Sequence, residues 1–326
     1  MERLVMPETK EFKTIEQQIN ALDERKLKFK NKTKAREILS KYNYFDIING
    51  FETILLQPET AIKEYKNVYF EDFWDLYKFD MKLKKQTLFK VFDVESRMRA
   101  AISYHFTSEY CNTIYTTMNY IKREFYQAPD PSDRYLTKKF KDFDLFRPTK
   151  YDGKGAVTKE SFIDALKKEK AYVGKYIDPP FWVVIKSFPL GSLYYTYLFL
   201  RDDVKQKVLR DFNLSLSDSS VFEQAVYVLK EVRNQCAHLE LITRFRLKRT
   251  RKLKNYNDVT KYAGLSRTDL NYMDVVKIFK MFGGIQDLKW IVVMFYMKMC
   301  IKGRKKIANK ILAKMGRKSI WAWIKL

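Results

Sequence analysis

The sequence predicts an all-helical protein. Only 10 glycines and 8 prolines interrupt its 326 residues, whereas 46% of the residues are hydrophobic and 31% are charged. Because all-β proteins need many tight turns, which glycine and proline supply, this composition favours long helices. The hydrophobic content is sufficient for a core in one large domain or two small ones.

The N-terminal segment carries a helix start signal. Thr14 and Gln17 fit a capping box, in which the two side chains satisfy free backbone N–H groups at the start of a helix. We therefore predict a first helix from about Thr14 and a second over about residues 33–42.

Apolar residues recur at helical spacing between Leu88 and Phe106. This stripe predicts a helix with one side facing the core, formed by Leu88, Val91, Phe92, Met98, Ile102 and Phe106. Glu95 and Arg99 fall on the same stripe, and their spacing predicts a partly buried ion pair. The pair either fixes helix packing, which is the simpler interpretation, or lies beside a functional centre.

Residues 127–180 are rich in helix breakers, and we expect a long loop or lid there. The breakers are Pro129, Pro131, Pro148, Gly153, Gly155, Gly174, Pro179 and Pro180. The apolar segment 181–200 should return to helix, with an interruption near Pro189.

The clearest amphipathic helix follows Ser220, which together with Glu223 fits a second capping box. Apolar residues then recur at steps of mainly three and four, as Val221, Phe222, Ala225, Val228, Leu229, Val232, Cys236 and Leu239. A polar line runs beside this stripe and consists of Tyr227, Glu231, Asn234 and His238. Arg233 lies at the boundary between the two faces, so its long side chain can turn toward either one.

The residues at the end of this helix suit metal-independent RNA cleavage. A ribose 2′-hydroxyl attacks its own phosphate, which yields a 2′,3′-cyclic phosphate and a 5′-hydroxyl. Histidine can give or take the proton near neutral pH, and a guanidinium binds phosphate oxygens. The chain has two histidines, His105 and His238, which excludes a site built from several histidines. A helix histidine is more often structural, and the spacing of Arg233 and His238 leaves that alternative open.

The charge balance predicts a polyanionic partner, since 63 Lys and Arg against 39 Asp and Glu give +24 at pH 7. One basic cluster follows the amphipathic helix and comprises Arg244, Arg246, Lys248, Arg249, Arg251, Lys252 and Lys254. The segment 301–326 holds nine more cations together with Trp321 and Trp323, and no acidic residue follows Asp287. We predict RNA binding by the first cluster and by Arg304, Lys305 and Lys306. A solvated basic face or an anionic membrane surface are the alternatives.

No cofactor or metal is expected. Cys111, Cys236 and Cys300 form no C-x-x-C pair, so neither a disulfide framework nor a zinc site is supported. The N-terminus lacks the apolar core of a signal peptide, and the most apolar stretch, residues 290–297, is too short to span a bilayer. We expect a cytoplasmic protein without a membrane partner.

Residues 233–238, RNQCAH, resemble the R-N-x-x-x-H signature of the HEPN superfamily, and specifically the RNxCAH form of Abi-like abortive-infection proteins of the AbiD/AbiF group. Further segments agree in order: KTIEQQI at 13–19, NYFDIINGF at 43–51, VESRMRAAISYHF at 94–106 and PPFWVVIKSFPLGSLYYTYLFL at 179–200. The second of these is closest to the AbiF-like branch. The sequence after His238 departs from the family's AHxxRLxN pattern, which puts the fine positioning of the site in question.

The resemblance implies an all-α HEPN-type helical bundle with additional N- and C-terminal helices. It implies one domain over 1–326, with N-terminal helices at about 13–60, a HEPN core at about 61–300 and a basic tail at 301–326. Arg233 would bind phosphate, His238 would act as general acid or base, and Asn234 would orient them. From their positions on the two predicted helices, we also expect Tyr227, Glu231, Glu95 and Arg99 to support the site.

The activity implied by the resemblance is an endoribonuclease of antiphage defence, with a site formed by two copies of the chain. RNA would be the substrate, and a structured non-coding RNA is a second expected partner. The alternative is an RNA-binding protein that forms a stable ribonucleoprotein, with a silent or conditional nuclease activity. A membrane-surface protein that uses the C-terminal tail is a third hypothesis.

Overall fold

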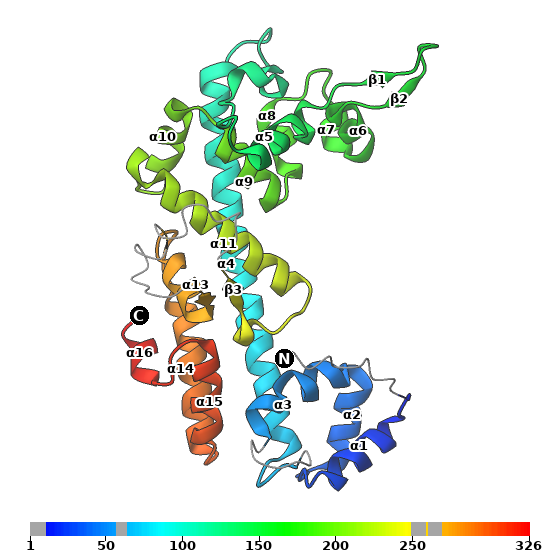
Figure 1. Ribbon diagram of the computed structural model, residues 1–326, viewed down its shortest axis with the longest axis vertical. Coiled ribbons are helices and arrows are strands. Elements are labelled where there is room, and N and C mark those ends of the chain that lie inside the picture. Colours follow the sequence, from blue (N-terminus) through cyan, green and yellow to red (C-terminus); the bar gives the residue numbers. More distant parts are fainter. Residues whose placement is uncertain (1–10, 57–63, 249–258, 260–268) are drawn as a thin grey trace. The chain divides into compact units, whose positions relative to one another are not determined.

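The computed structural model describes residues 11–56, 64–248, 259 and 269–326 (Figure 1). Helices dominate this part of the chain, and its only sheets are two antiparallel pairs of short strands. The predicted all-α class is therefore confirmed. No helix within the described ranges combines the length and apolar character needed to cross a bilayer.

The chain divides into two compact units, each assembled from separate segments. Unit 1 comprises Met1–Gln86, Leu241–Arg244 and Gln286–Leu326, and unit 2 comprises Thr87–Glu240 and Phe245–Ile285. The long helix α4 (Phe70–Tyr110) contributes its first part to unit 1 and the rest to unit 2.

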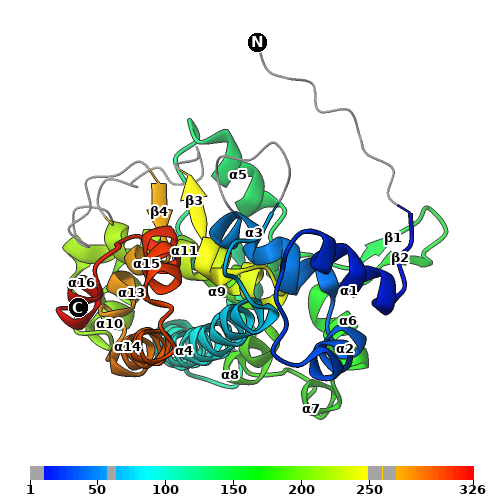
Figure 2. The same ribbon diagram turned by 90° about the horizontal axis from the view of Figure 1, so that it is seen from below.

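Unit 1 contains helices from both ends of the sequence. Besides the start of α4, these are α1 (Ile15–Glu24), α2 (Lys32–Lys41), a π-helix (Phe45–Asn49), α3 (Gly50–Leu55), a 3-10 helix (Ile242–Arg244), α14 (Gln286–Ile301), α15 (Lys305–Met315) and α16 (Ile320–Ile324). Helix α1 packs beside α2, and α14 beside α15 and α16 (Figures 1 and 2). The predicted capping box of α1 is confirmed. The backbone N–H of Gln17 donates to Thr14 Oγ1, and the backbone N–H of Thr14 donates to Gln17 Oε1.

Two contacts show how closely the elements of unit 1 pack. The rings of Phe79 on α4 and Phe295 on α14 stack with centroids 3.9 Å apart. A Cβ atom at Gly50 would lie 3.0 Å from Leu241 Cδ1, so the glycine lets the segment after α11 approach α3 closely.

Unit 2 contains the remaining elements. Its helices are α5 (Arg134–Lys141), α6 (Phe162–Glu169), α7 (Ala171–Gly174), α8 (Phe181–Val184), α9 (Leu190–Phe199), α10 (Asp202–Arg210), α11 (Ser219–Ala237) and α13 (Tyr272–Phe279), with short 3-10 helices between them. Strand β1 (Lys150–Tyr151) pairs with β2 (Val157–Lys159), and β3 (Arg246–Lys248) pairs with β4 (Asp269–Asn271). Aromatic rings fill the core, where Phe181 stacks on Tyr120 at 4.9 Å and meets Phe106 edge-on at 5.3 Å.

The predicted loop or lid over 127–180 is wrong, because this segment contains α5, α6, α7 and the β1–β2 hairpin. Its apolar residues fold inward despite the helix breakers, and Phe140 and Phe143 both pack edge-on against Phe199 of α9. The prediction of helix after Pro180, interrupted near Pro189, is confirmed, since these prolines immediately precede α8 and α9.

One residue of the predicted apolar stripe on α4 is misplaced. Phe92 is 52% exposed, whereas Val91, Met98 and Ile102 are buried. A single step along a helix turns the side chain by about 100°, so Phe92 leaves the buried face that Val91 occupies.

Candidate functional site

The helix that carries the candidate site begins earlier than predicted. Helix α11 starts at Ser219 with Asp218 as N-cap, so the predicted capping box at Ser220 is wrong. The capping box lies a few residues upstream, where the Ser215 amide donates to Asp218 Oδ2 at 2.9 Å. The apolar face is buried as predicted at Phe222, Ala225, Val228, Leu229, Val232 and Cys236.

Helix α11 ends at the candidate residues themselves. Ala237 is its last residue and His238 its C-cap, with the His238 amide donating to the Asn234 carbonyl at 3.0 Å. The next two amides donate back to the carbonyls of Cys236 and Gln235, at 3.2 and 3.1 Å, which is the pattern of a Schellman motif.

Leu239 therefore does not continue the apolar stripe, and that prediction is wrong. Its φ of +59° lies in the left-handed region, and its side chain is 60% exposed. Glycine is the usual residue at this position of the motif, because a Cβ atom is unfavourable there. The helix end beside His238 thus holds a strained backbone.

Leu239→Gly is expected to raise the free energy of unfolding by about 0.5–1 kcal/mol. The substitution removes the strain of a left-handed leucine, which costs roughly 1–2 kcal/mol. Part of this gain in stability is offset, because glycine has greater conformational freedom in the unfolded chain. Urea denaturation measures the difference. Leu216→Gly, in the 3-10 helix Leu216–Asp218, is the control and should destabilise; equal losses from both variants would contradict the assigned strain.

The three central residues differ in exposure. Arg233 and Asn234 are half-buried and His238 is exposed. Within the described ranges, none of the three side chains forms a hydrogen bond or ion pair. The other histidine differs, because His105 Nε2 lies 2.9 Å from Asp211 Oδ2.

The predicted ion pair between Glu95 and Arg99 is confirmed, and Glu95 is buried. Arg99 Nη2 also donates to the Phe188 carbonyl at 2.8 Å. The guanidinium thereby ties α4 to the segment that precedes α9, which favours the structural interpretation of the pair.

The other two supporting residues lie on α11. Tyr227 is buried and meets Tyr194 edge-on at 5.8 Å, and the Lys230 ammonium lies 4.5 Å from the centroid of the Tyr227 ring. Lys230 also pairs with Glu231 at 2.9 Å. Lys230 therefore contacts both Tyr227 and Glu231, and it was not among the residues predicted to support the site.

The first basic cluster is not uniform. Arg244 is half-buried and donates to Thr53 Oγ1 at 2.9 Å, and burial lowers the pKa of its guanidinium, against the opposing charge of Asp80. Arg246 and Lys248 are exposed on β3. The other members, Arg249, Arg251, Lys252 and Lys254, lie outside the described residues.

A buried polar cluster in unit 1 fixes the segment that follows the motif. Asp80 Oδ1 accepts hydrogen bonds from the Thr243 amide at 2.9 Å and from Thr243 Oγ1 at 2.7 Å. Asp80 Oδ2 lies 3.2 Å from Lys84 Nζ, and all three residues are buried. Burial raises the pKa of the Asp80 carboxyl, whereas Lys84 and Thr243 act in the opposite direction. No local sequence pattern points to this cluster, because Asp80 and Thr243 are 163 positions apart.

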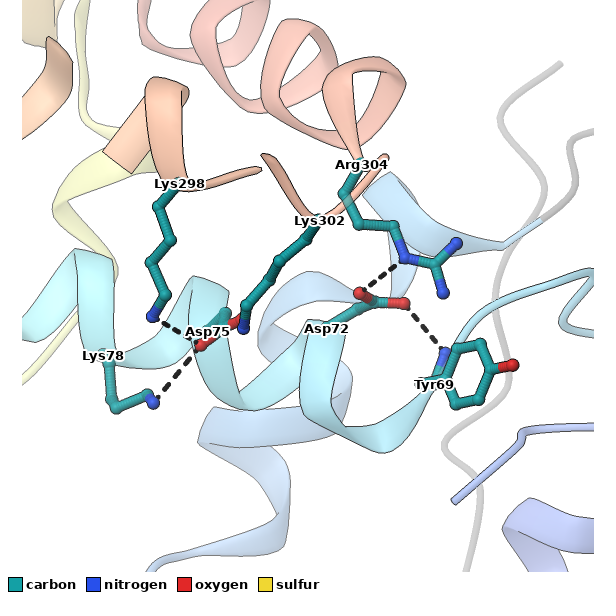
Figure 3. Close-up of polar contacts among 7 residues, drawn as sticks. All are labelled: Tyr69, Asp72, Asp75, Lys78, Lys298, Lys302 and Arg304. Atoms are coloured by element: carbon teal, nitrogen blue, oxygen red, sulfur yellow. Dashed lines mark hydrogen bonds and ion pairs between the residues drawn. The ribbon is translucent and has the colours of Figure 1, made fainter. Parts of the chain in front are cut away.

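Two cations of the basic segment 301–326, Lys302 and Arg304, pair with two buried carboxylates on α4, Asp75 and Asp72 (Figure 3). Arg304 Nε lies 3.0 Å from Asp72 Oδ1, and its guanidinium lies 5.0 Å from the centroid of the Tyr69 ring. Asp75 pairs with Lys78 at 3.2 Å, with Lys298 at 3.0 Å and with Lys302. Burial raises the pKa of Asp75, but the hydrogen bonds from Lys302 and Lys298 outweigh it and leave that pKa lowered.

The remaining cations selected in the tail are accessible. Lys305 and Lys306 are exposed at the start of α15. Of the two tryptophans, Trp321 is 66% exposed, whereas Trp323 is buried. Arg304 is thus held by unit 1 itself, while its two neighbours remain open to a ligand.

Comparison with known proteins gives one match. The family model of Abi-like proteins matches residues 37–242, which include the whole of α11 and the segment 233–238. The searches of curated proteins and of solved structures found no match. Because the family model covers more than half of the chain, the chain belongs to the family of Abi-like proteins.

Proposed function

We propose that this protein is a metal-independent HEPN endoribonuclease that acts in the cytoplasm in abortive-infection defence. Membership of the Abi-like family supports the defence role. The observation that carries the proposal is the end of α11, where an exposed imidazole and a half-buried guanidinium have no partner among the described residues. Both are therefore available to a phosphate of RNA.

Each residue has a role that its chemistry suits. His238 takes the proton from the attacking 2′-hydroxyl or gives one to the leaving 5′-oxygen, since imidazole titrates near neutral pH. Arg233 binds the phosphate and balances the charge that develops on the phosphorane. The backbone carbonyl of Asn234 accepts a hydrogen bond from the backbone N–H of His238. Asn234 therefore helps to hold the residue that presents the imidazole.

A second copy of the chain explains the spacing of the motif. Arg233 and His238 are five residues apart, and five steps of an α-helix turn the side-chain direction by about 140°. The two side chains of one copy therefore diverge around the helix axis. If the arginine of one copy meets the histidine of another, both side chains can reach the same phosphate. We propose a homodimer for this reason.

Cross-complementation tests this arrangement. Arg233→Ala and His238→Ala should each be inactive as pure homodimers. Co-expression of the two single variants should restore cleavage, because a mixed dimer retains one site with an intact arginine and an intact histidine. The regained products should carry 2′,3′-cyclic phosphate and 5′-hydroxyl ends in the presence of EDTA. Mixed dimers without activity would contradict a shared site, and cleavage that EDTA abolishes would contradict the mechanism.

Stable RNA binding without cleavage is the second candidate function. It is favoured by the exposed cations Lys305 and Lys306, which do not belong to α11. Purified protein with a single abundant structured RNA bound, and no cleavage in the assay above, would support the ribonucleoprotein instead of the enzyme.

A further inference from the structure

Unit 1 contains a groove of about 710 Å³ between the end of α3, residues 66–68 and the first turns of α15. Five of its described lining residues are lysine or arginine. No described lining residue is acidic. Its apolar lining includes Leu55, Val68 and Ile307. The groove thus combines strong positive charge with apolar surface.

Two of the five cations are occupied by the protein itself. Arg304 pairs with Asp72 (Figure 3) and also donates to the Asn67 carbonyl at 3.0 Å. Lys310 donates to the Ile54 carbonyl at 2.9 Å. These two residues therefore hold the walls of the groove together.

The other three cations are available. Lys66, Lys305 and Lys306 are exposed, and in the described part of the chain their ammonium groups have no hydrogen bond or ion pair. Like charges around one groove repel each other, and an anion placed among them relieves that repulsion. The charge of the groove therefore suits a ligand with several negative charges.

We propose that this groove binds the sugar–phosphate backbone of a single RNA strand. Its volume lies in the range that accommodates a nucleotide-sized group, and its apolar lining suits a sugar or base beside the phosphates. A bilayer surface is too broad to enter such a groove, which favours RNA over anionic lipid. The binding residues belong to unit 1 and none to α11, so the site goes beyond the proposed nuclease and does not depend on it.

A pair of matched double variants tests the groove. Lys305→Ala/Lys306→Ala removes two lining cations, and Arg317→Ala/Lys318→Ala removes two exposed cations of unit 1 that do not line it. Both variants lose the same net charge. The probe is a short fluorescent single-stranded RNA, and its affinity is measured by anisotropy over a range of salt concentrations in a His238→Ala background that keeps the RNA intact.

The groove variant is expected to weaken RNA binding at least about tenfold and to lower the slope of log affinity against log salt by about 1.4, since each contact to a single strand contributes about 0.7. The control variant should lose less than about threefold. Lys66→Ala should reproduce part of the groove effect, because Lys66 also lines the groove. Thermal melting by circular dichroism verifies that each variant is folded.

Three results would overturn the proposal: equal losses from the two double variants, an unchanged salt slope, or a groove variant that loses binding to phosphatidylserine vesicles while its RNA affinity stays intact. Failure of the nuclease proposal looks different. In that case the chain with an intact His238 leaves RNA uncleaved, yet the groove variant still shows its specific loss of affinity.

Discussion

Replacement of His238 by alanine is expected to lower the rate of RNA cleavage by about 10²- to 10⁴-fold, the range that general acid–base catalysis contributes. RNA affinity should stay within about twofold, because the substitution leaves in place Arg233 and the cations that we propose to bind phosphate. Folding should also be retained, since in the described residues the His238 side chain has no hydrogen bond or ion pair to lose.

Single-turnover cleavage of a labelled RNA measures this effect. His105→Gln is the matched control, because it changes the other histidine of the chain, whose ring contacts Asp211. The control should cleave at nearly the rate of the unmodified protein. If His238→Ala cleaved as fast as His105→Gln and gave the same products, His238 would not be the proton-transfer group.

Asp80→Ala is expected to destabilise unit 1 by about 3–5 kcal/mol. The substitution removes the carboxylate that lies 3.2 Å from the buried Lys84 ammonium, and removing one partner of a buried ion pair costs about this much. It also takes away the acceptor of both hydrogen bonds from Thr243.

Urea denaturation followed by circular dichroism measures the loss. Asp23→Ala is the control, because it breaks an ion pair with Lys32 in which both side chains are more than 40% exposed. Exposed pairs contribute less than about 1 kcal/mol, so the control should stay close to the unmodified protein. Equal midpoints for the two variants would show that the buried pair does not stabilise the fold.

Local signals predicted much of the fold. The capping box at Thr14 depends on atoms within one helical turn, and the apolar spacing of α11 depends on one helix, so both could be read from the sequence. The segment 127–180 could not, because its helices α5 and α6 are short and gain stability from packing against distant elements. The helix breakers lie outside these two helices, for example Gly153 and Gly155 in the turn between β1 and β2, so they gave no sign of the helices between them.

The candidate site was predictable to the same extent. The ion pair of Glu95 and Arg99 follows from a spacing of four residues, and its geometry is confirmed. Asp80 and Thr243 are 163 positions apart in the sequence, so no local pattern could predict their contact. For the same reason, the sequence did not distinguish Arg304, which a buried carboxylate holds, from Lys305, which is exposed.

The division of the chain into interleaved units has a consequence for synthesis. Every residue of unit 2 has been translated once Ile285 is added, whereas unit 1 also needs α14, α15 and α16, which are translated after Ile285. Helix α3 therefore meets its packing partner α15 only after all of unit 2 has been translated. A ribosome that stalls before Gln286 releases a chain in which Phe79 lacks its stacking partner Phe295, so truncated products should be targets for cellular proteases.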